Sequence, residues 1–79
     1  MMKECKVKFG SIEDVKEFVG IANSCVFDID LLSGRYAIDA KSIMGIFSLD
    51  LTKELSLIAH SNGEDGKEFL EEIQKFIVD

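Results

Sequence analysis

The chain has 79 residues, of which 47% are hydrophobic and 30% are charged, and its net charge at pH 7 is −6. This length predicts a single globular domain, 1–79, which is too small to enclose a deep active-site cavity. Because an acidic chain repels phosphate backbones and anionic lipid, we expect neither nucleic acid nor a membrane surface as a partner.

The first third of the chain predicts a strand followed by a helix. Residues 4–9, ECKVKF, alternate between polar and apolar, which indicates a half-buried strand with Cys5, Val7 and Phe9 on one face. Ser11 is followed three residues later by Asp14, the spacing of a capping box. Apolar residues then recur at helical spacing, so an amphipathic helix is predicted over 11–23.

A hairpin and a short helix are predicted next. Residues 26–32 and 35–40 both alternate, and Ser33-Gly34 between them supplies a turn. In the second strand the alternation predicts that Tyr36, Ile38 and Ala40 face inward. The apolar residues of 42–49 are too crowded for a strand with one polar face, so this stretch is predicted to be a short helix.

The last third predicts a fourth strand over 54–60, a polar break at SNGEDG and a final helix over 65–78. The element order is therefore β-α-β-β-α-β-α. Since every strand has one apolar face, we predict an α+β fold, an open-faced β-sandwich in which three helices cover one face of a four-stranded antiparallel sheet. The predicted core includes Val7, Phe18, Ile29, Leu57 and Ile73.

The cysteines and the single histidine suggest no metal site, and we expect no cofactor. Cys5 and Cys25 do not have metal-ligand spacing, and His60 is expected on the solvated face of the fourth strand. The start of the chain, MMKECKVKFG, has no unbroken apolar region, and no stretch approaches the ~20 apolar residues of a membrane span. We therefore expect a cytoplasmic protein with reduced thiols.

Residues 41–49, KSIMGIFSL, resemble the segment Lys-Ser-Ile/Leu-Met-Gly-Val-Met/Leu-Ser-Leu of HPr, the small phosphocarrier family of the bacterial sugar phosphotransferase system. DIDL at 28–31, the break SNGEDG and the closing LEEIQKFI add weaker similarity, and the element order agrees from end to end. The resemblance implies the HPr-like sandwich predicted above. Asp50 departs from it, because the family usually has a glycine just after this segment.

The phosphocarrier motif of the family is degenerate in this chain. In the family, Gly-Leu-His-Ala-Arg-Pro-Ala opens the first helix, and its histidine carries the phosphoryl group. Counting back from Ser42 without gaps, that window falls on FGSIEDV, 9–15. Ser11 then stands in place of the histidine, Glu13 in place of the arginine and Asp14 in place of the proline. A serine hydroxyl without a base is a weak nucleophile, and two carboxylates repel phosphate, so we expect the carrier chemistry to be lost.

Ser42 matches the serine that HPr kinase/phosphorylase modifies in many members of the family. One branch, the catabolite-repression HPr homologue, has lost the histidine and kept this serine, and the present chain shows the same combination. The resemblance implies regulatory phosphorylation of Ser42. It also implies that Lys41, Ile43, Met44 and Phe47 bind a partner, with Met44 and Phe47 the residues expected to be exposed.

Two hypotheses about function remain open at this stage. The first is a regulatory or adaptor protein that is controlled at Ser42 and recognised by protein partners, namely HPr kinase/phosphorylase, a transcriptional regulator or a sugar-system enzyme. The alternative is an interaction module on the same fold that is never phosphorylated, with Ser42 serving only as a helix cap. We do not expect an enzyme, since no nucleophile–base pair, metal cluster or glycine-rich phosphate loop is evident.

Overall fold

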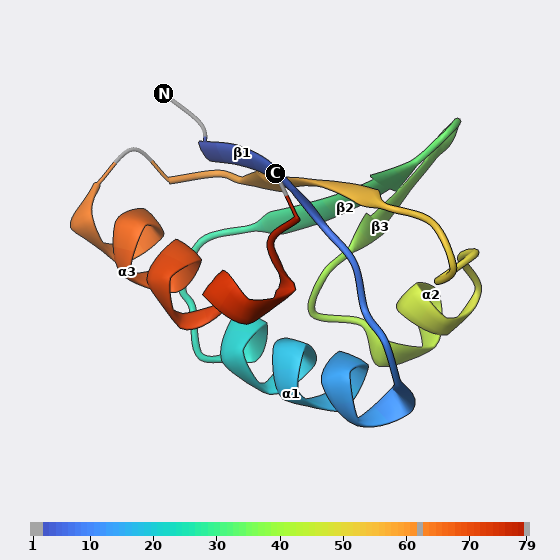
Figure 1. Cartoon of the computed structure of the whole chain (residues 1–79). Helices are drawn as coiled ribbons and strands as arrows, with labels where there is room; N and C mark the ends of the chain where they lie inside the picture. The colour runs from blue at the N-terminus through green and yellow to red at the C-terminus, as the bar shows by residue number, and fades with distance from the viewer. Residues whose placement is uncertain (1–2, 62, 79) are drawn as a thin grey trace.

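Three helices cover one face of a four-stranded sheet in the computed structural model, which describes residues 3–61 and 63–78 (Figure 1). The elements are β1 (Lys3–Val7), α1 (Ile12–Asn23), β2 (Ile29–Ser33), β3 (Tyr36–Asp39), α2 (Ile43–Phe47), β4 (Leu55–Ala59) and α3 (Glu64–Glu72), followed by a 3-10 turn (Gln74–Phe76). The predicted fold class and element order are confirmed. Asn62, in the predicted break SNGEDG, lies outside the described residues.

The sheet has the strand order β1-β4-β2-β3, and every neighbouring pair is antiparallel. Strand β4 lies in the interior of the sheet and alternates fully, with Leu55, Leu57 and Ala59 buried against the helices. The five predicted core residues, Val7, Phe18, Ile29, Leu57 and Ile73, are all completely buried. Each contributes about 1.5–3 kcal/mol relative to an exposed side chain, so this shared core holds the helices on the sheet.

Helix α1 begins where its sequence predicts. The Ser11 Oγ accepts the backbone N–H of Asp14 (N to O 3.2 Å), as in a capping box. Its buried face consists of Val15, Phe18 and Ala22, at helical spacing. Ile12, in contrast, is 59% exposed although it continues the same apolar stripe. The first turn of α1 therefore presents an apolar side chain to solvent.

The final helix is shorter than predicted. It ends at Glu72 and is followed by the 3-10 turn, and Ile77 then pairs with Val7 of β1. The backbone N–H of Lys8 donates to the Phe76 carbonyl, and that of Val78 donates to the Lys6 carbonyl, both at 2.9 Å. Because β1 is an edge strand with unpaired backbone groups, an extended chain end satisfies them better than further helix does. The prediction of helix up to residue 78 is therefore wrong.

The β2–β3 hairpin projects beyond the helices that cover the rest of the sheet (Figure 1). Gly34, with φ 58°, takes the first position of its two-residue turn, where a type II′ turn needs glycine. Tyr36 lies next to this turn and is 69% exposed, so the prediction that it faces the core is wrong. Its alternation phase is correct, but no helix reaches far enough to cover it.

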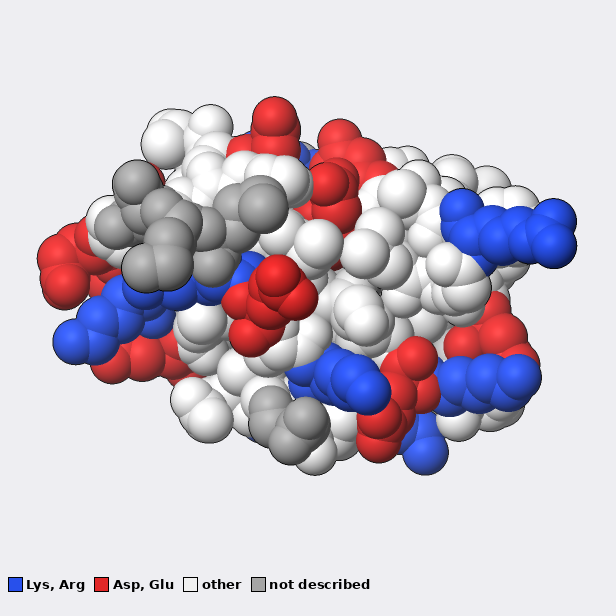
Figure 2. All heavy atoms as spheres, turned by 90° about the horizontal axis from the view of Figure 1, so that it is seen from above, with Lys and Arg blue, Asp and Glu red and all other residues white. Residues whose placement is uncertain are grey.

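Among the residues that the structure describes, no helix lies over the outer face of the sheet (Figure 1). Figure 2 looks onto this face and shows acidic and basic side chains scattered among uncharged ones, with neither sign forming a continuous field. This distribution does not suit a nucleic-acid surface, which needs a clustered positive field. The serines that the sequence singles out, Ser11 and Ser42, lie instead at the starts of helices α1 and α2.

Candidate functional site

Ser42 occupies the N-cap of α2 and is exposed. Its Oγ accepts the backbone N–H of Gly45 (N to O 3.2 Å), and its own backbone is extended, as an N-cap residue requires. The first turn of α2 contains no acidic side chain. An anionic group on this hydroxyl would therefore meet free backbone N–H groups and no carboxylate of its own helix.

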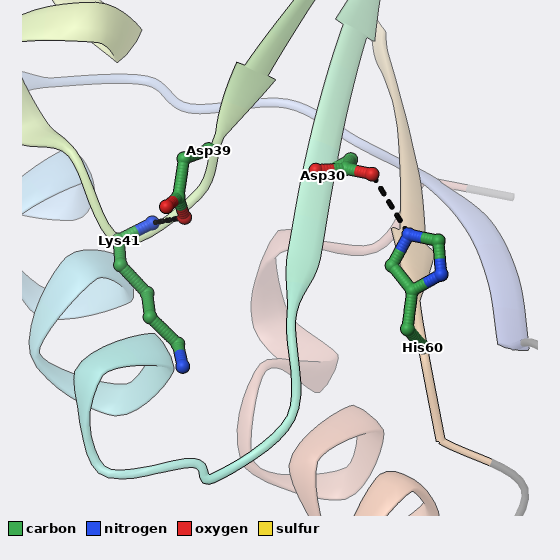
Figure 3. Close-up of polar contacts among 4 residues, drawn as sticks. All are labelled: Asp30, Asp39, Lys41 and His60. Carbon is green, nitrogen blue, oxygen red and sulfur yellow. Dashed lines mark hydrogen bonds and ion pairs between the residues drawn. The ribbon is translucent and has the colours of Figure 1, made fainter.

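Lys41 is held by bonds to other parts of the chain. Its backbone N–H donates to Asp39 Oδ1 (2.9 Å), as Figure 3 shows, and its carbonyl accepts from Asn23 Nδ2 (3.2 Å). Its ammonium donates to the backbone carbonyl of Cys25 (2.9 Å), and the side chain is half-buried. Lys41 therefore links the segment before Ser42 to the end of α1 by hydrogen bonds. The amino-acid sequence did not predict this role.

The apolar residues of α2 divide between the core and the surface. Ile46 is completely buried, and Ile43 is half-buried against the core. Met44 is 76% exposed and Phe47 is 39% exposed, as predicted for these two residues. Because a short helix has no need for two large exposed apolar side chains beside an exposed serine, they form a candidate docking surface.

Gly45 lies on the inner side of α2, against β3. A Cβ atom at this position would come within 2.6 Å of Ile38 Cγ2 and 3.3 Å of Ser42 Oγ. The glycine therefore allows α2 to approach the sheet closely and leaves room for the hydroxyl of Ser42. This contact accounts for the glycine by packing within the chain.

The start of α1 brings the residues of the degenerate window together. Glu13 and Asp14 both lie in its first turn, and Ser11 caps it. The Asp14 carboxylate also accepts the backbone N–H of Gly10 (N to O 3.0 Å). A carboxylate of the chain itself thus occupies the Gly10 amide and places negative charge at the start of α1, where an external anion would bind.

A groove of about 470 Å³ adjoins this window and is lined by Lys8, Phe9, Gly10, Ser11, Ile12, Leu51 and Thr52. Its walls come from the β1–α1 connection and from the loop after α2. In that loop the Asp50 carboxylate accepts the hydroxyl and the backbone N–H of Thr52, and these bonds lower the pKa of Asp50. The lining of the groove is mainly apolar, and Lys8 is its one basic residue. The amino-acid sequence did not predict this groove.

His60 lies on the exposed side of the sheet, as predicted, but it has a partner that its sequence did not reveal. Its Nε2 lies 2.7 Å from Asp30 Oδ2 (Figure 3). Asp30 pairs directly with Ile58, so His60 is its diagonal neighbour across the β2–β4 ladder. The alternation of both strands could have placed the two side chains on one face, but only the strand order makes them neighbours.

Residues 3–61 and 63–78 offer neither a metal-binding cluster nor a membrane-spanning helix. There, no three His, Cys, Asp or Glu side chains come close enough to hold a metal ion. Within the same ranges, no helix has the length and apolar character needed to cross a membrane. Cys5 and Cys25 are free, and burial raises the pKa of both thiols, which makes them poor nucleophiles.

Comparison with known families gives one matching description, "PTS HPr component phosphorylation site", over residues 14–79. The matched range includes Ser42 and all of α2, and it begins after Ser11 and Glu13. No curated protein matches the sequence.

Three similar solved structures share the fold. The phosphocarrier protein HPr from Bacillus anthracis is 26% identical, with 99% of this chain and 96% of that chain covered and a TM-score of 0.69. HPr-C-His from Thermoanaerobacter tengcongensis is 24% identical over 95% and 88% of the two chains, with a TM-score of 0.73, which supports the fold alone. The catabolite repression containing protein Crh from Bacillus subtilis, a domain-swapped dimer, is 32% identical over 94% and 88%, with a TM-score of 0.63.

Proposed function

This chain belongs to the HPr family of the phosphotransferase system, and we propose that it is a regulatory or adaptor member controlled by phosphorylation of Ser42. In this proposal it acts in the cytoplasm through protein partners and catalyses no reaction itself. The phosphocarrier step of the family is lost. The similarity to Crh, at 32% identity, favours the regulatory branch.

The observation that carries this proposal is the setting of Ser42. Its hydroxyl is exposed, its helix contributes no carboxylate to the first turn, and the exposed Met44 and Phe47 lie within the next five residues. A kinase can reach such a hydroxyl without unfolding the chain. The phosphate would then stand beside the apolar side chains that a partner would contact, so that modification could change binding.

The setting of Ser11 supports the loss of the carrier step. A phosphoryl group on this residue would meet the carboxylates of Glu13 and Asp14 in the first turn of α1. The Asp14 carboxylate already accepts the Gly10 amide. His60, the only histidine of the chain, lies on the sheet and not among the helices.

Phosphorylation at Ser42 is tested by incubating the protein with HPr kinase/phosphorylase and ATP, followed by mass spectrometry of the peptides. We expect one phosphate, at Ser42, and none on Ser42→Ala. Ser11→Ala is the matched control, because it removes the other helix N-cap serine that the structure describes, and it should be modified like the unaltered protein. An unmodified protein, or a phosphate on another residue, would contradict the proposal.

The loss of the carrier step is tested with phosphoenolpyruvate and the first enzyme of the phosphotransferase system. We expect no labelled phosphate on this protein, and little on Ser11→His, since Glu13 and Asp14 still repel the phosphoryl group. HPr with its histidine serves as the positive control. Labelling of the unaltered protein would show that a carrier function persists.

The alternative, an interaction module that is never phosphorylated, also has support in the contacts around Ser42. The hydroxyl already accepts the Gly45 amide, and the Lys41 ammonium is bonded to Cys25, so both side chains have structural roles. Partner binding separates the two hypotheses. Ser42→Asp should change the affinity for a partner only if this position regulates binding.

A further inference from the structure

A second groove lies between α3 and the connection from α1 to β2. Figure 1 shows these two segments at the other end of the helical layer from α2. It has a volume of about 220 Å³ and is lined by Ser24, Cys25, Val26, Phe27, Asp65, Glu68, Phe69 and Glu72. None of these residues belongs to the phosphocarrier window or to α2, and the one link to the Ser42 segment is the bond from the Lys41 ammonium to the Cys25 carbonyl.

One side of this groove is apolar. The rings of Phe27 and Phe69 pack edge to face, with centroids 6.0 Å apart, and Phe69 is buried beneath. Phe27 is half-buried, and Val26 beside it is 92% exposed, which makes it the most exposed large hydrophobic residue that the structure describes. An apolar side chain entering the groove would therefore contact both Phe27 and Val26.

The wall formed by α3 is acidic. Asp65, Glu68 and Glu72 are spaced by three and four residues, so they lie along one side of the helix. Asp65 is engaged locally, because its Oδ1 accepts the Ser61 hydroxyl and the Gly66 backbone N–H. Glu68 and Glu72 form no ion pair or side-chain hydrogen bond with any residue in 3–61 or 63–78. Their charge is therefore free to meet a cation from outside.

The pKa of the Cys25 thiol shows which charged side chains lie near the groove. This pKa is raised first by burial and next by the negative charge of Glu72, with a smaller contribution from Asp65. The nearby Lys41 ammonium lowers it, but less than Glu72 raises it. Glu72 thus affects the thiol more strongly than Lys41 does, and the lining of the groove contains three carboxylates and no lysine or arginine.

We propose that this groove docks a basic, apolar segment of a partner protein, with a lysine or arginine of that segment paired to Glu68 and Glu72 and a neighbouring apolar side chain placed on Val26 and Phe27. Charge selects this occupant: an acidic segment or a second copy of this chain, of net charge −6, would be repelled. The long aliphatic stem of lysine or arginine suits a groove with one apolar side and an acidic wall. This surface is additional to the one at α2.

The test uses end-blocked hexapeptides as probes and NMR of the ¹⁵N-labelled full chain. The peptide of alternating lysine and leucine should shift the amide signals of residues 24–27 and 65–72. Peptides of alternating glutamate and leucine, or lysine and serine, should bind more weakly. Added salt should weaken binding of the basic, apolar peptide, because exposed ion pairs are screened.

Two double variants give a matched comparison on the same helix. Glu68→Gln with Glu72→Gln should weaken binding of the basic, apolar peptide by about threefold or more, as expected for two exposed ion pairs. Glu64→Gln with Glu71→Gln removes the same charge outside the groove and should have a smaller effect. Val26→Ser should also weaken binding. The proposal is overturned if the peptide does not bind, if the shifts lie elsewhere, or if both double variants weaken binding equally.

Discussion

Helices α1 and α2 both begin at a serine whose Oγ accepts a backbone N–H three residues later, at 3.2 Å in each case. Around that shared bond the two starts differ. The first turn of α1 carries Glu13 and Asp14, whereas that of α2 carries no acidic residue. One hydrogen-bond motif can therefore stand in a site that repels phosphate or in one that tolerates it, and the neighbouring charges make the difference.

Helices α1 and α2 also differ in how closely their glycines pack against neighbouring side chains. Gly20 of α1 is exposed and has open space where a Cβ would be, whereas Gly45 of α2 faces Ile38. Helix α1 has 12 residues and α2 has five, so α2 depends more on its contact with the sheet than on its own backbone bonds. The predictions below test this contrast.

The largest expected effect is that of Gly45→Ala. A methyl group there collides with Ile38, so we expect a loss of about 1–3 kcal/mol in the free energy of unfolding. The matched variant Gly20→Ala meets no neighbouring atom and should stabilise the protein by about 0.5–1 kcal/mol. Urea denaturation measures both. If both variants were stabilising, α2 would not be seated as tightly as described.

Removal of the two serine caps should have a smaller effect. Ser11→Ala should lower the free energy of unfolding by about 1 kcal/mol, because the orphan amide of Asp14 loses its acceptor. Ser42→Ala should cost less, since α2 is only one short turn. Thermal and urea unfolding compare the variants directly. A larger cost at Ser42 would mean that its hydroxyl supports more of the fold than α2 alone.

Ser42→Asp should change stability by less than about 1 kcal/mol, because aspartate is also an N-cap residue and meets no carboxylate in the first turn of α2. The same substitution at Ser11 would add a charge next to Glu13 and Asp14 and should be less favourable. Urea denaturation of the two variants at low salt gives the comparison. Equal costs would refute the electrostatic contrast between the two helix starts.

The smallest effect concerns the loop that faces the start of α1. The Thr52 hydroxyl, and then the Thr52 backbone N–H, lower the pKa of Asp50, so Thr52→Val should raise that pKa. Because the pKa is lowered in the folded state, the bond stabilises the fold at pH values above the unfolded pKa. That contribution is lost as the pH falls through the folded pKa. NMR titration of the Asp50 carboxyl checks the direction, and an unchanged pKa would exclude the hydroxyl bond.

Local patterns predicted much of the candidate site. The capping serines and the alternation of β4 follow from residues a few positions apart, whereas the exposure of Met44 and Phe47 was expected from the resemblance to HPr. Two structural predictions are wrong, and in both cases tertiary structure rather than local pattern decided the outcome. Residues 73–78 have a helical pattern, yet the open edge of β1 draws Ile77 out of the helix, and Tyr36 is exposed because no helix reaches it.

The sequence by itself determined the element order, the faces of the strands and the identity of both helix caps, since these depend on side-chain period and on hydrogen bonds within one turn. Only the tertiary structure decided which distant residues meet. The bond from Lys41 to Cys25, the Asp30–His60 pair and the groove between residues 24–27 and α3 all arise from the strand order and from the way the helices pack on the sheet. Such contacts join segments that are far apart in the chain, where local propensity carries no information.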